Sequence, residues 1–162
     1  MQHIYAWRLA SQKHRDTALL GTGSAIAGGR WNPVGTKVVY CASSLALAVL
    51  EVRVHMPVAT HQPTQPFVGI ELGIAENAIE APLESQLPPH WRVAPKLSTE
   101  NTPARRFGQR WIDEARSVAL RLPSAVIPTE WIYLLNPAHP GFSTAVERKR
   151  EIAVVFDPRL WT

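Results

Sequence analysis

The stretches of this chain that resemble β-strands are not joined by regular helices, and this restricts the possible folds more than any other feature. Helical patterns cover only residues 45–56 and about 103–116, while proline-rich connectors occupy 57–66 and 82–103. Strands are predicted from alternating or apolar runs at residues 4–9, 37–42, 67–72, 118–122, 131–135 and 151–156. Because a doubly wound fold needs regular helical crossovers, the sequence predicts the α+β class, with mixed sheets and flanking helices.

Two of the predicted strands, 67–72 and 151–156, are apolar enough to lie in the interior of a sheet. The chain has 162 residues, of which 46% are hydrophobic, so we expect one domain over residues 1–162. The longest apolar run, 45–50, is too short to span a membrane. Residues 1–7 lack the pattern of a secretory signal, which favours a cytoplasmic protein.

Charge and cysteine content narrow the kinds of ligand. The net charge is +4, which raises nucleic acid as a partner, but the basic residues form no block. Arginine outnumbers lysine by 13 to 4, and its planar fork suits bidentate binding of phosphate, so a discrete phosphate-containing ligand explains the bias at least as well as DNA. The single cysteine, Cys41, excludes an internal disulfide and a cysteine-based zinc motif, so we predict no metal site.

A glycine-rich segment at residues 21–35, which holds five glycines and a proline, is predicted to be a loop. Glycines next to Arg30 would let the backbone approach a ligand while the guanidinium binds an anion, and Trp31 could stack on a planar ring. The alternative is an ordinary turn with a surface arginine. Tyr40 follows this segment closely and is either a core residue or a residue that faces a base or ribose.

Glu51 lies in the middle of the apolar helix predicted at 45–56. A buried carboxylate is costly unless it is paired or hydrogen-bonded, and Arg53 is two residues away and points elsewhere on a helix. Arg8, on the apolar face of the first predicted strand, and Arg30 are the free candidate partners. Two interpretations remain: a buried ion pair, or a carboxylate directed into a pocket to stabilise developing positive charge.

The remaining polar candidates give weaker signals. Ser124 lies where a predicted strand turns, and no Ser-His-Asp arrangement supports a nucleophile, so a hydrogen-bonding role is the economical interpretation. His55 and His61 are separated by Pro57 and share no helix face, which favours a surface or capping role for both. His139, in the sequence NPAHPG, is expected to order a turn.

Taken together, these segments resemble the RES family, which is named for arginine, glutamate and serine positions and supplies the toxins of bacterial toxin–antitoxin modules. The segments that carry the resemblance follow the family order: GGRWNPVGTKVVYCASSLALAVLEVRVH, LPSAVIP, LLNPAHPGF and FDPRLW. The resemblance implies a fold similar to the ADP-ribosyltransferases and a site for NAD. In this family the bond between nicotinamide and ribose is broken and ADP-ribose passes to phosphate or water, which depletes NAD and arrests growth.

The resemblance also assigns residues. It implies NAD as substrate, no prosthetic group and inorganic phosphate as a possible co-substrate. The implied catalytic residues are Arg30, Glu51, Ser124 and Tyr40, and the implied NAD-binding residues are Arg8, Arg30, Trp31, Tyr40 and Ser124. In these roles Glu51 stabilises an oxocarbenium-like ribose, and Arg30 and Arg8 bind the pyrophosphate. Tyr40 and Trp31 stack on nicotinamide, and Ser124 hydrogen-bonds its amide or the ribose.

One position departs from the family pattern, because Ile132 stands where an asparagine is usual. Affinity or acceptor choice is expected to differ if that asparagine touches substrate. The resemblance further implies a partner, an Xre-type helix-turn-helix antitoxin that blocks the active site, with DNA bound only through it. Two other functions stay open: a protein ADP-ribosyltransferase, and a non-catalytic basic domain whose DNA binding would be sensitive to salt and indifferent to Glu51→Ala.

Overall fold

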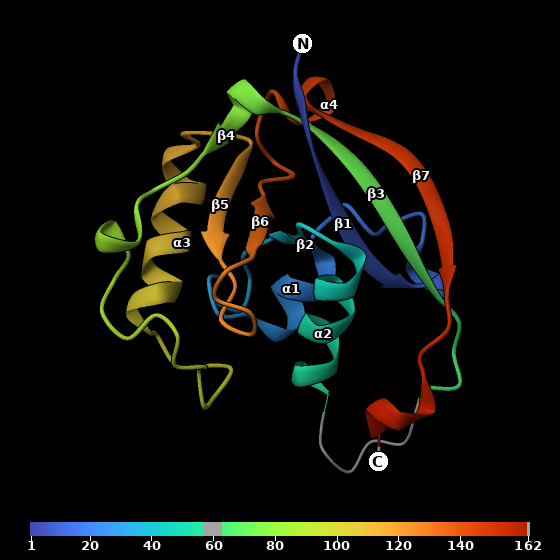
Figure 1. Cartoon of the computed structure of the whole chain (residues 1–162). Helices are drawn as coiled ribbons and strands as arrows, with labels where there is room; N and C mark the ends of the chain where they lie inside the picture. Colours follow the sequence, from blue (N-terminus) through green and yellow to red (C-terminus); the bar gives the residue numbers. More distant parts are fainter. Residues whose placement is uncertain (57–62, 162) are drawn as a thin grey trace.

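A computed structural model describes residues 1–56 and 63–161 of the chain and shows one sheet of seven strands (Figure 1). The strand order is β4-β5-β6-β2-β1-β3-β7. The strands are β1 (His3–Ser11), β2 (Val39–Ala42), β3 (Phe67–Ala75), β4 (Ile79–Glu80), β5 (Ala119–Pro123), β6 (Trp131–Leu135) and β7 (Val146–Val154). The short pair β4–β5 is parallel and all other pairs are antiparallel, so the sheet is mixed and the α+β prediction is confirmed.

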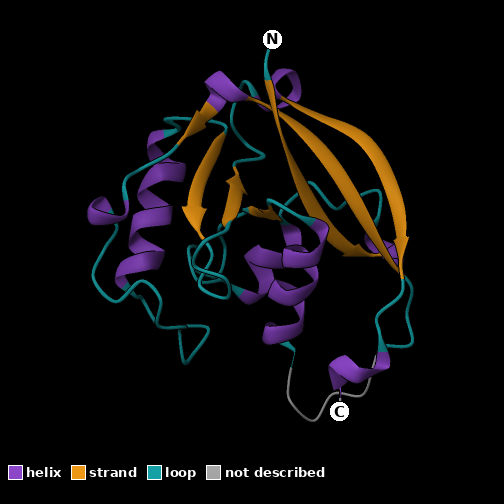
Figure 2. Cartoon of the chain, viewed as in Figure 1, coloured by secondary structure: helices purple, strands orange, loops and turns teal. Residues whose placement is uncertain are grey.

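In the chain each helix lies between two strands, and in space the helices lie around the sheet (Figure 2). They are α1 (Thr22–Ala27), α2 (Leu45–His55), α3 (Pro103–Glu114) and α4 (Phe142–Ala145), with 3-10 turns at Gln12–His14, Glu76–Ala78, Glu84–Gln86 and Pro158–Trp161. Within the described residues, none of the helices combines the length and apolarity needed to cross a bilayer.

The centre of the sheet opens between β1 and β2. These strands meet at a single register pair, Trp7 with Ala42, whereas β1 pairs with β3 along all nine of its residues. Beyond Trp7, β1 therefore diverges from β2. The two helices α1 and α2 lie in front of this divergence, in the middle of the molecule (Figure 1). This arrangement gives the chain a place for a site that is bounded by both strands and both helices.

The two longer helices form where their sequence signals predict. In α2, the Ser44 hydroxyl accepts a hydrogen bond from the Leu47 N–H at 3.1 Å, which caps the first turn. This helix buries Leu47 and Ala48 in the core cluster that also contains Trp7 of β1. In α3, Thr102 caps the helix in the same way and Pro103 occupies the first turn.

Two predictions about local structure are wrong. The segment 21–35 is not all loop, because residues 22–27 form α1, which is flanked by Gly21 and Gly28, both at a positive φ of 70°. The last strand is not in the sheet interior: β7 starts at Val146 and lies at the edge, paired only with β3. Its charged residues at 147–151 suit an edge, where solvent reaches one side of the strand.

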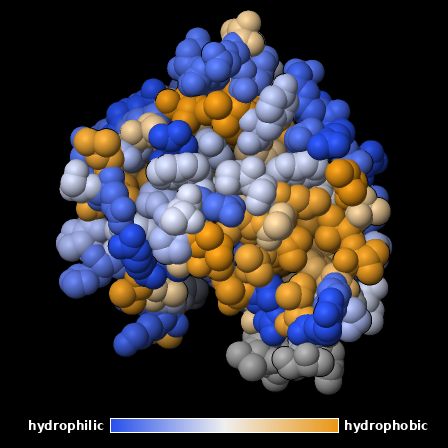
Figure 3. Space-filling model, viewed as in Figure 1, coloured by the Kyte–Doolittle hydropathy of each residue, from blue (hydrophilic) through white to orange (hydrophobic). Residues whose placement is uncertain are grey.

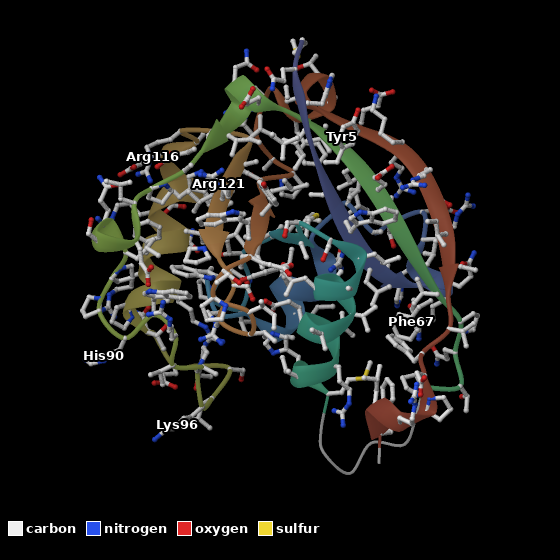
Figure 4. All side chains as sticks on the ribbon, in the orientation of Figure 1. Tyr5, Phe67, His90, Lys96, Arg116 and Arg121 are labelled. Atoms are coloured by element: carbon white, nitrogen blue, oxygen red, sulfur yellow. The ribbon has the colours of Figure 1, made fainter. Side chains whose placement is uncertain are left out.

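The interior position predicted for 67–72 is confirmed, since β3 lies between β1 and β7. The 82–103 connector is largely irregular and runs along the outside of α3, where Figure 4 labels His90 and Lys96. Of the other connector, residues 57–62 lie outside the described part of the chain, and His61 with them.

Candidate active site

A cavity of about 870 Å³ fills the region where β1 diverges from β2. Its wall is made by β1, α1, the glycine-rich segment, β2 and α2, with contributions from the residues after β5 and from β6. The space-filling view shows an apolar surface around α2, beside a notch that separates this helix from the 82–103 connector (Figure 3). The charged and titratable side chains that line the cavity are Arg8, His14, Arg30, Tyr40, Cys41, Glu51 and His55.

The side chain of Glu51 reaches the cavity from the middle of α2, and one of its carboxylate oxygens accepts a hydrogen bond from a residue outside the cavity lining. Ser124, directly after β5, donates a hydrogen bond from Oγ to Glu51 Oε1 at 2.7 Å. The same hydroxyl accepts hydrogen bonds from the backbone N–H groups of Val126 and Ile127, both at 3.0 Å. Since the one proton and both lone pairs of this hydroxyl are used, its orientation is fixed. Glu51 is therefore held with Oε2 available to a ligand.

Of the two interpretations of Glu51, the structure shows the carboxylate on the cavity wall. Among the described residues it forms no ion pair with an arginine; its charged neighbour is His55, one helical turn later, with Nε2 at 3.9 Å from Oε2. The side chain of Glu51 is 22% exposed and that of His55 is 63% exposed. A surface or capping role was predicted for His55, and the structure adds that its side chain lies beside the Glu51 carboxylate at the cavity.

Two arginines face the same cavity without a carboxylate of their own. Arg8 donates from Nη1 to the Tyr40 carbonyl at 3.3 Å, and its Nε is buried with no hydrogen-bond partner in the described chain. Arg30 donates both Nη1 hydrogens, to the carbonyls of Trp91 at 3.1 Å and Arg92 at 2.6 Å. Burial lowers the pKa of both arginines, because it removes water from a charged guanidinium. An anionic ligand would compensate that loss.

The position of Arg30 is set by a hydrogen-bonded loop. The Tyr40 hydroxyl donates to Asn32 Oδ1 at 2.7 Å and accepts from the Trp31 N–H at 3.1 Å. Asn32 is fully buried, and its Nδ2 donates to the carbonyls of Ser24, Pro33 and Thr36. Burial also raises the pKa of Tyr40, so this hydroxyl stays protonated and keeps donating. Tyr40 thus ties the glycine-rich segment to β2.

Glycine is required at position 29 for lack of space. A Cβ atom there would lie 2.5 Å from the Tyr40 hydroxyl oxygen and 2.7 Å from Asn32 Oδ1. Both distances are far shorter than any real Cβ contact. From the sequence, the glycines here were expected to let the backbone approach a ligand, whereas Gly29 lets it approach Tyr40 and Asn32 of the protein itself, next to Arg30.

The ring of Trp31 is in the core, where it cannot stack on a ligand without rearrangement. It is fully buried and packs against Trp91, with ring centroids 5.7 Å apart, and against the edge of Phe107. Ser124 is likewise fully buried and bonds to Glu51, so the contact it makes in this structure is with the carboxylate rather than with the cavity. Arg8, Arg30, Tyr40 and Glu51 are brought together on the cavity wall, as their predicted roles require.

Ile132 lies in the cavity wall, on β6 next to Ala42 of β2. Together with Ala48, Val52 and Ala125 it forms an apolar lining on the side of Glu51. An asparagine at this position would place an amide in the same wall. Position 132, where an effect on affinity or acceptor choice is expected, therefore lies in the cavity wall.

Arg105 was not singled out by the sequence, although it lies three residues before Gly108 on the buried stripe of α3. It is 3% exposed, and it binds the carbonyl of Gly29. His139 does order a turn, as predicted, by accepting from the Gly141 N–H at 3.0 Å. Among the described residues, no group of three or more His, Cys, Asp or Glu side chains is arranged to hold a metal ion.

Comparison with known proteins gives one family across almost the whole chain. The model of the RES domain matches residues 5–157. "Toxin Res" of Yersinia enterocolitica is 31% identical over 154 residues, which cover 95% of this chain and 97% of the relative. "Prs ADP-ribosylating toxin" of a Sphingobium species is 34% identical over 159 residues, covering 95% and 94%. One chain in the crystal structure of the MbcT–MbcA toxin–antitoxin complex of M. tuberculosis shares the fold, with a TM-score of 0.66 at 17% identity. The match covers 99% of this chain and 87% of that chain.

Proposed function

Because the chain belongs to the RES domain family, we propose that it is a toxin of a toxin–antitoxin pair and that it breaks the bond between nicotinamide and ribose in NAD. The observation that carries this proposal is that one cavity holds both a carboxylate fixed by Ser124 and two arginines, Arg8 and Arg30, which form no ion pair within the described part of the chain. NAD offers what such a cavity binds: a pyrophosphate with two negative charges, and a glycosidic bond whose cleavage builds positive charge on ribose.

In the proposed reaction the bond between ribose C1′ and the nicotinamide nitrogen breaks, and the electron pair leaves with nicotinamide. Glu51 stabilises the oxocarbenium-like ribose through the oxygen that Ser124 leaves free. An oxygen of water or of phosphate then bonds to C1′, and when water is the acceptor it releases one proton to the solvent. NAD is thus the substrate and no prosthetic group takes part.

Arg30 and Arg8 bind the pyrophosphate. Arg30 keeps the Nε and Nη2 donors without a protein acceptor in the described chain, which leaves one edge of its fork for phosphate oxygens. Tyr40 shapes the cavity and holds Arg30 in place through Asn32. These assignments give the catalytic and NAD-binding residues Arg8, Arg30, Tyr40 and Glu51, with Ser124 acting through Glu51 and Trp31 acting through the core.

The second candidate is a protein ADP-ribosyltransferase that uses the same cavity. The name of the Sphingobium relative, an ADP-ribosylating toxin, favours it, and only the acceptor differs. The third, a non-catalytic basic domain, has the net charge of +4 in its favour. It gives no reason for a carboxylate locked at a cavity.

We also propose the partner and the compartment. The shared fold with a toxin that was solved with its antitoxin supports an antitoxin partner. That this antitoxin is of the Xre helix-turn-helix type and covers the cavity is what the family resemblance implies. DNA would then be bound only through the antitoxin. NAD in the cytoplasm is the pool on which the enzyme would act.

The experiment that tests the function is nicotinamide release from NAD by the purified protein, with and without inorganic phosphate. Release that depends on phosphate identifies a phosphorylase, and release without phosphate a hydrolase. The variant Glu51→Gln should lose at least about 100-fold in kcat, as expected for a lost transition-state charge. Glu114→Gln, which removes an exposed carboxylate paired with Arg116, is the matched control and should keep full activity.

The same experiment separates the alternatives. Absence of release, together with labelled protein in a lysate supplied with NAD, would favour protein ADP-ribosylation. Absence of both, with DNA binding that weakens as salt rises, would favour the basic binding domain.

A further inference from the structure

Arg105 is a buried cation whose hydrogen-bond acceptors, within the residues that the structure describes, are all backbone carbonyls. It is 3% exposed and lies in the first turn of α3. Among the described residues no carboxylate comes within ion-pair distance of it. Its guanidinium donates to the carbonyls of Gly29 at 2.9 Å, Leu97 at 3.1 Å, Ser98 at 2.7 Å and Glu100 at 2.7 Å. Burying a charge without a counter-ion is costly, so this residue needs a role that a neutral side chain cannot fill.

The first of these carbonyls belongs to the peptide group that joins Gly29 to Arg30. Arg105 Nε therefore fixes the root of Arg30 directly, and the Gly29 N–H is fixed as well, by the Asn32 carbonyl at 2.9 Å. The tip of Arg30 is fixed by the carbonyls of Trp91 and Arg92. Arg30 is thus held at both ends.

The two arginines also attach the same connector to the glycine-rich segment. Arg30 binds it at residues 91–92, and Arg105 binds it at residues 97–100. The connector buries Leu87 and Trp91 in the core, and these hydrogen bonds add polar contacts that hold its backbone at residues 91–92 and 97–100. A shift of Arg105 would move both the root of Arg30 and the chain that holds its tip.

The residues around Arg105 are so closely packed that neighbouring glycines have no room for a side chain. A Cβ atom at Gly28 would lie 2.9 Å from Arg105 Nη2, and a Cβ at Gly108 would lie 1.8 Å from the Trp31 carbonyl oxygen. The first two turns of α3 are thus in direct contact with the loop that carries Arg30. The charge of Arg105 is also felt in the cavity wall, where it lowers the pKa of Tyr40 against the larger effect of burial.

We propose that Arg105 is a positioning residue that sets Arg30 to receive the anionic part of the substrate. This inference rests on the proposed function, in which Arg30 binds the pyrophosphate of NAD. Arg105 itself touches no substrate. Its fork takes several carbonyls at once, which a lysine ammonium, a compact point charge, does not reproduce.

The test compares Arg105→Lys, Arg30→Lys and the double variant in the nicotinamide-release assay. We expect each single variant to raise KM for NAD about tenfold while kcat changes little, because binding of the unreactive pyrophosphate is what suffers. We expect the double variant to be no worse than Arg30→Lys alone, since both changes remove one function. Arg106→Lys is the control: this neighbour is exposed, donates only to the Asn101 carbonyl, and should leave KM unchanged.

Different results are expected if Arg105 contributes to stability alone and does not position Arg30. Multiplying effects in the double variant, or a loss of kcat with KM unchanged, would overturn the inference. Hydrogen exchange supplies a readout that does not need activity: in Arg105→Lys the amides of residues 29–32 should exchange faster, while those of β5 and β6 stay as in the wild type. Exchange that rises evenly over the chain, or not at all, would also overturn it. If the wild type released no nicotinamide, the proposed function would fail, and the exchange result would decide the placement of Arg30 separately.

Discussion

The hydroxyl of Ser124 lies 2.7 Å from Glu51 Oε1 and is itself fixed by two backbone N–H groups. The two residues are 73 positions apart in the chain, on the turn after β5 and on α2. Ser124 is thus the support of Glu51. A carboxylate on an exposed helix face would rotate freely, whereas this one presents the same oxygen to every ligand.

Ser124→Ala should lower both stability and activity. The substitution leaves the N–H groups of Val126 and Ile127 and one oxygen of Glu51 without their partner, so we expect a loss of about 1–3 kcal/mol in the free energy of unfolding. We also expect kcat for nicotinamide release to fall about tenfold or more, because Glu51 loses its orientation. Denaturant titration and steady-state kinetics measure the two effects.

Ser117→Ala provides the comparison. Its hydroxyl also bridges two groups, accepting from Trp111 Nε1 and donating to the Ala119 carbonyl, both at 2.8 Å, but neither of these partners lines the cavity, whereas Glu51, the partner of Ser124, does. It should lose similar stability and keep kcat. Equal loss of kcat in both variants would show that Ser124 acts through stability alone.

A pair of glycines tests the tight packing below Arg30. Gly29→Ala puts a Cβ into the Tyr40 hydroxyl and Asn32, so we expect a loss of about 1–3 kcal/mol and a clear rise in KM for NAD. Gly23→Ala meets nothing within 4 Å and lies inside α1, where alanine favours the helix by about 0.5–1 kcal/mol. Thermal unfolding should therefore shift in opposite directions. A shift in the same direction for both would contradict the contacts described for Gly29.

Signals that are local in sequence predicted their elements well. The serine before α2 and the Thr102–Pro103 pair before α3 are capping signals that need no knowledge of the rest of the chain, and both helices begin there. Glu51 could be singled out because a carboxylate inside an apolar helix needs an explanation wherever that helix lies. Arg8 could be singled out for the same reason, because it places a charge on the apolar face of the first strand.

Features that depend on distant partners could not be predicted. The aromatic ring of Trp31 looked free to stack on a ligand because nothing local shows that Trp91 and Phe107 cover it. The edge position of β7 depends on the order of strands, which the apolar residues near 152–156 do not reveal. Arg105 resembles a surface arginine in sequence, since its acceptors lie in two other segments.

Cys41 should be inert in the folded protein. The thiol is 4% exposed, and burial raises its pKa to about 12, so the reactive thiolate is scarce near neutral pH even though Arg8 favours it. We expect a thiol reagent at pH 8 to label less than about a tenth of the native protein in the time that labels the unfolded protein fully. As this is the only cysteine in the chain, the signal has one source. Rapid labelling without denaturant would show that β2 is accessible.

Ile132→Asn tests whether the apolar wall beside Glu51 tunes substrate binding. Ile132 is 7% exposed and borders the cavity, so an asparagine there is half in the core, and we expect a loss of about 1–3 kcal/mol in the free energy of unfolding. In compensation, its amide offers NAD a donor and an acceptor that isoleucine lacks, and KM for NAD should fall several-fold, as for a modest hydrogen bond of about 1 kcal/mol. Ile132→Val, which keeps the wall apolar, should leave KM as it is. If both variants shift KM equally, the shape of the wall matters and its polarity does not. If neither shifts it, Ile132 lines a part of the cavity that NAD does not reach.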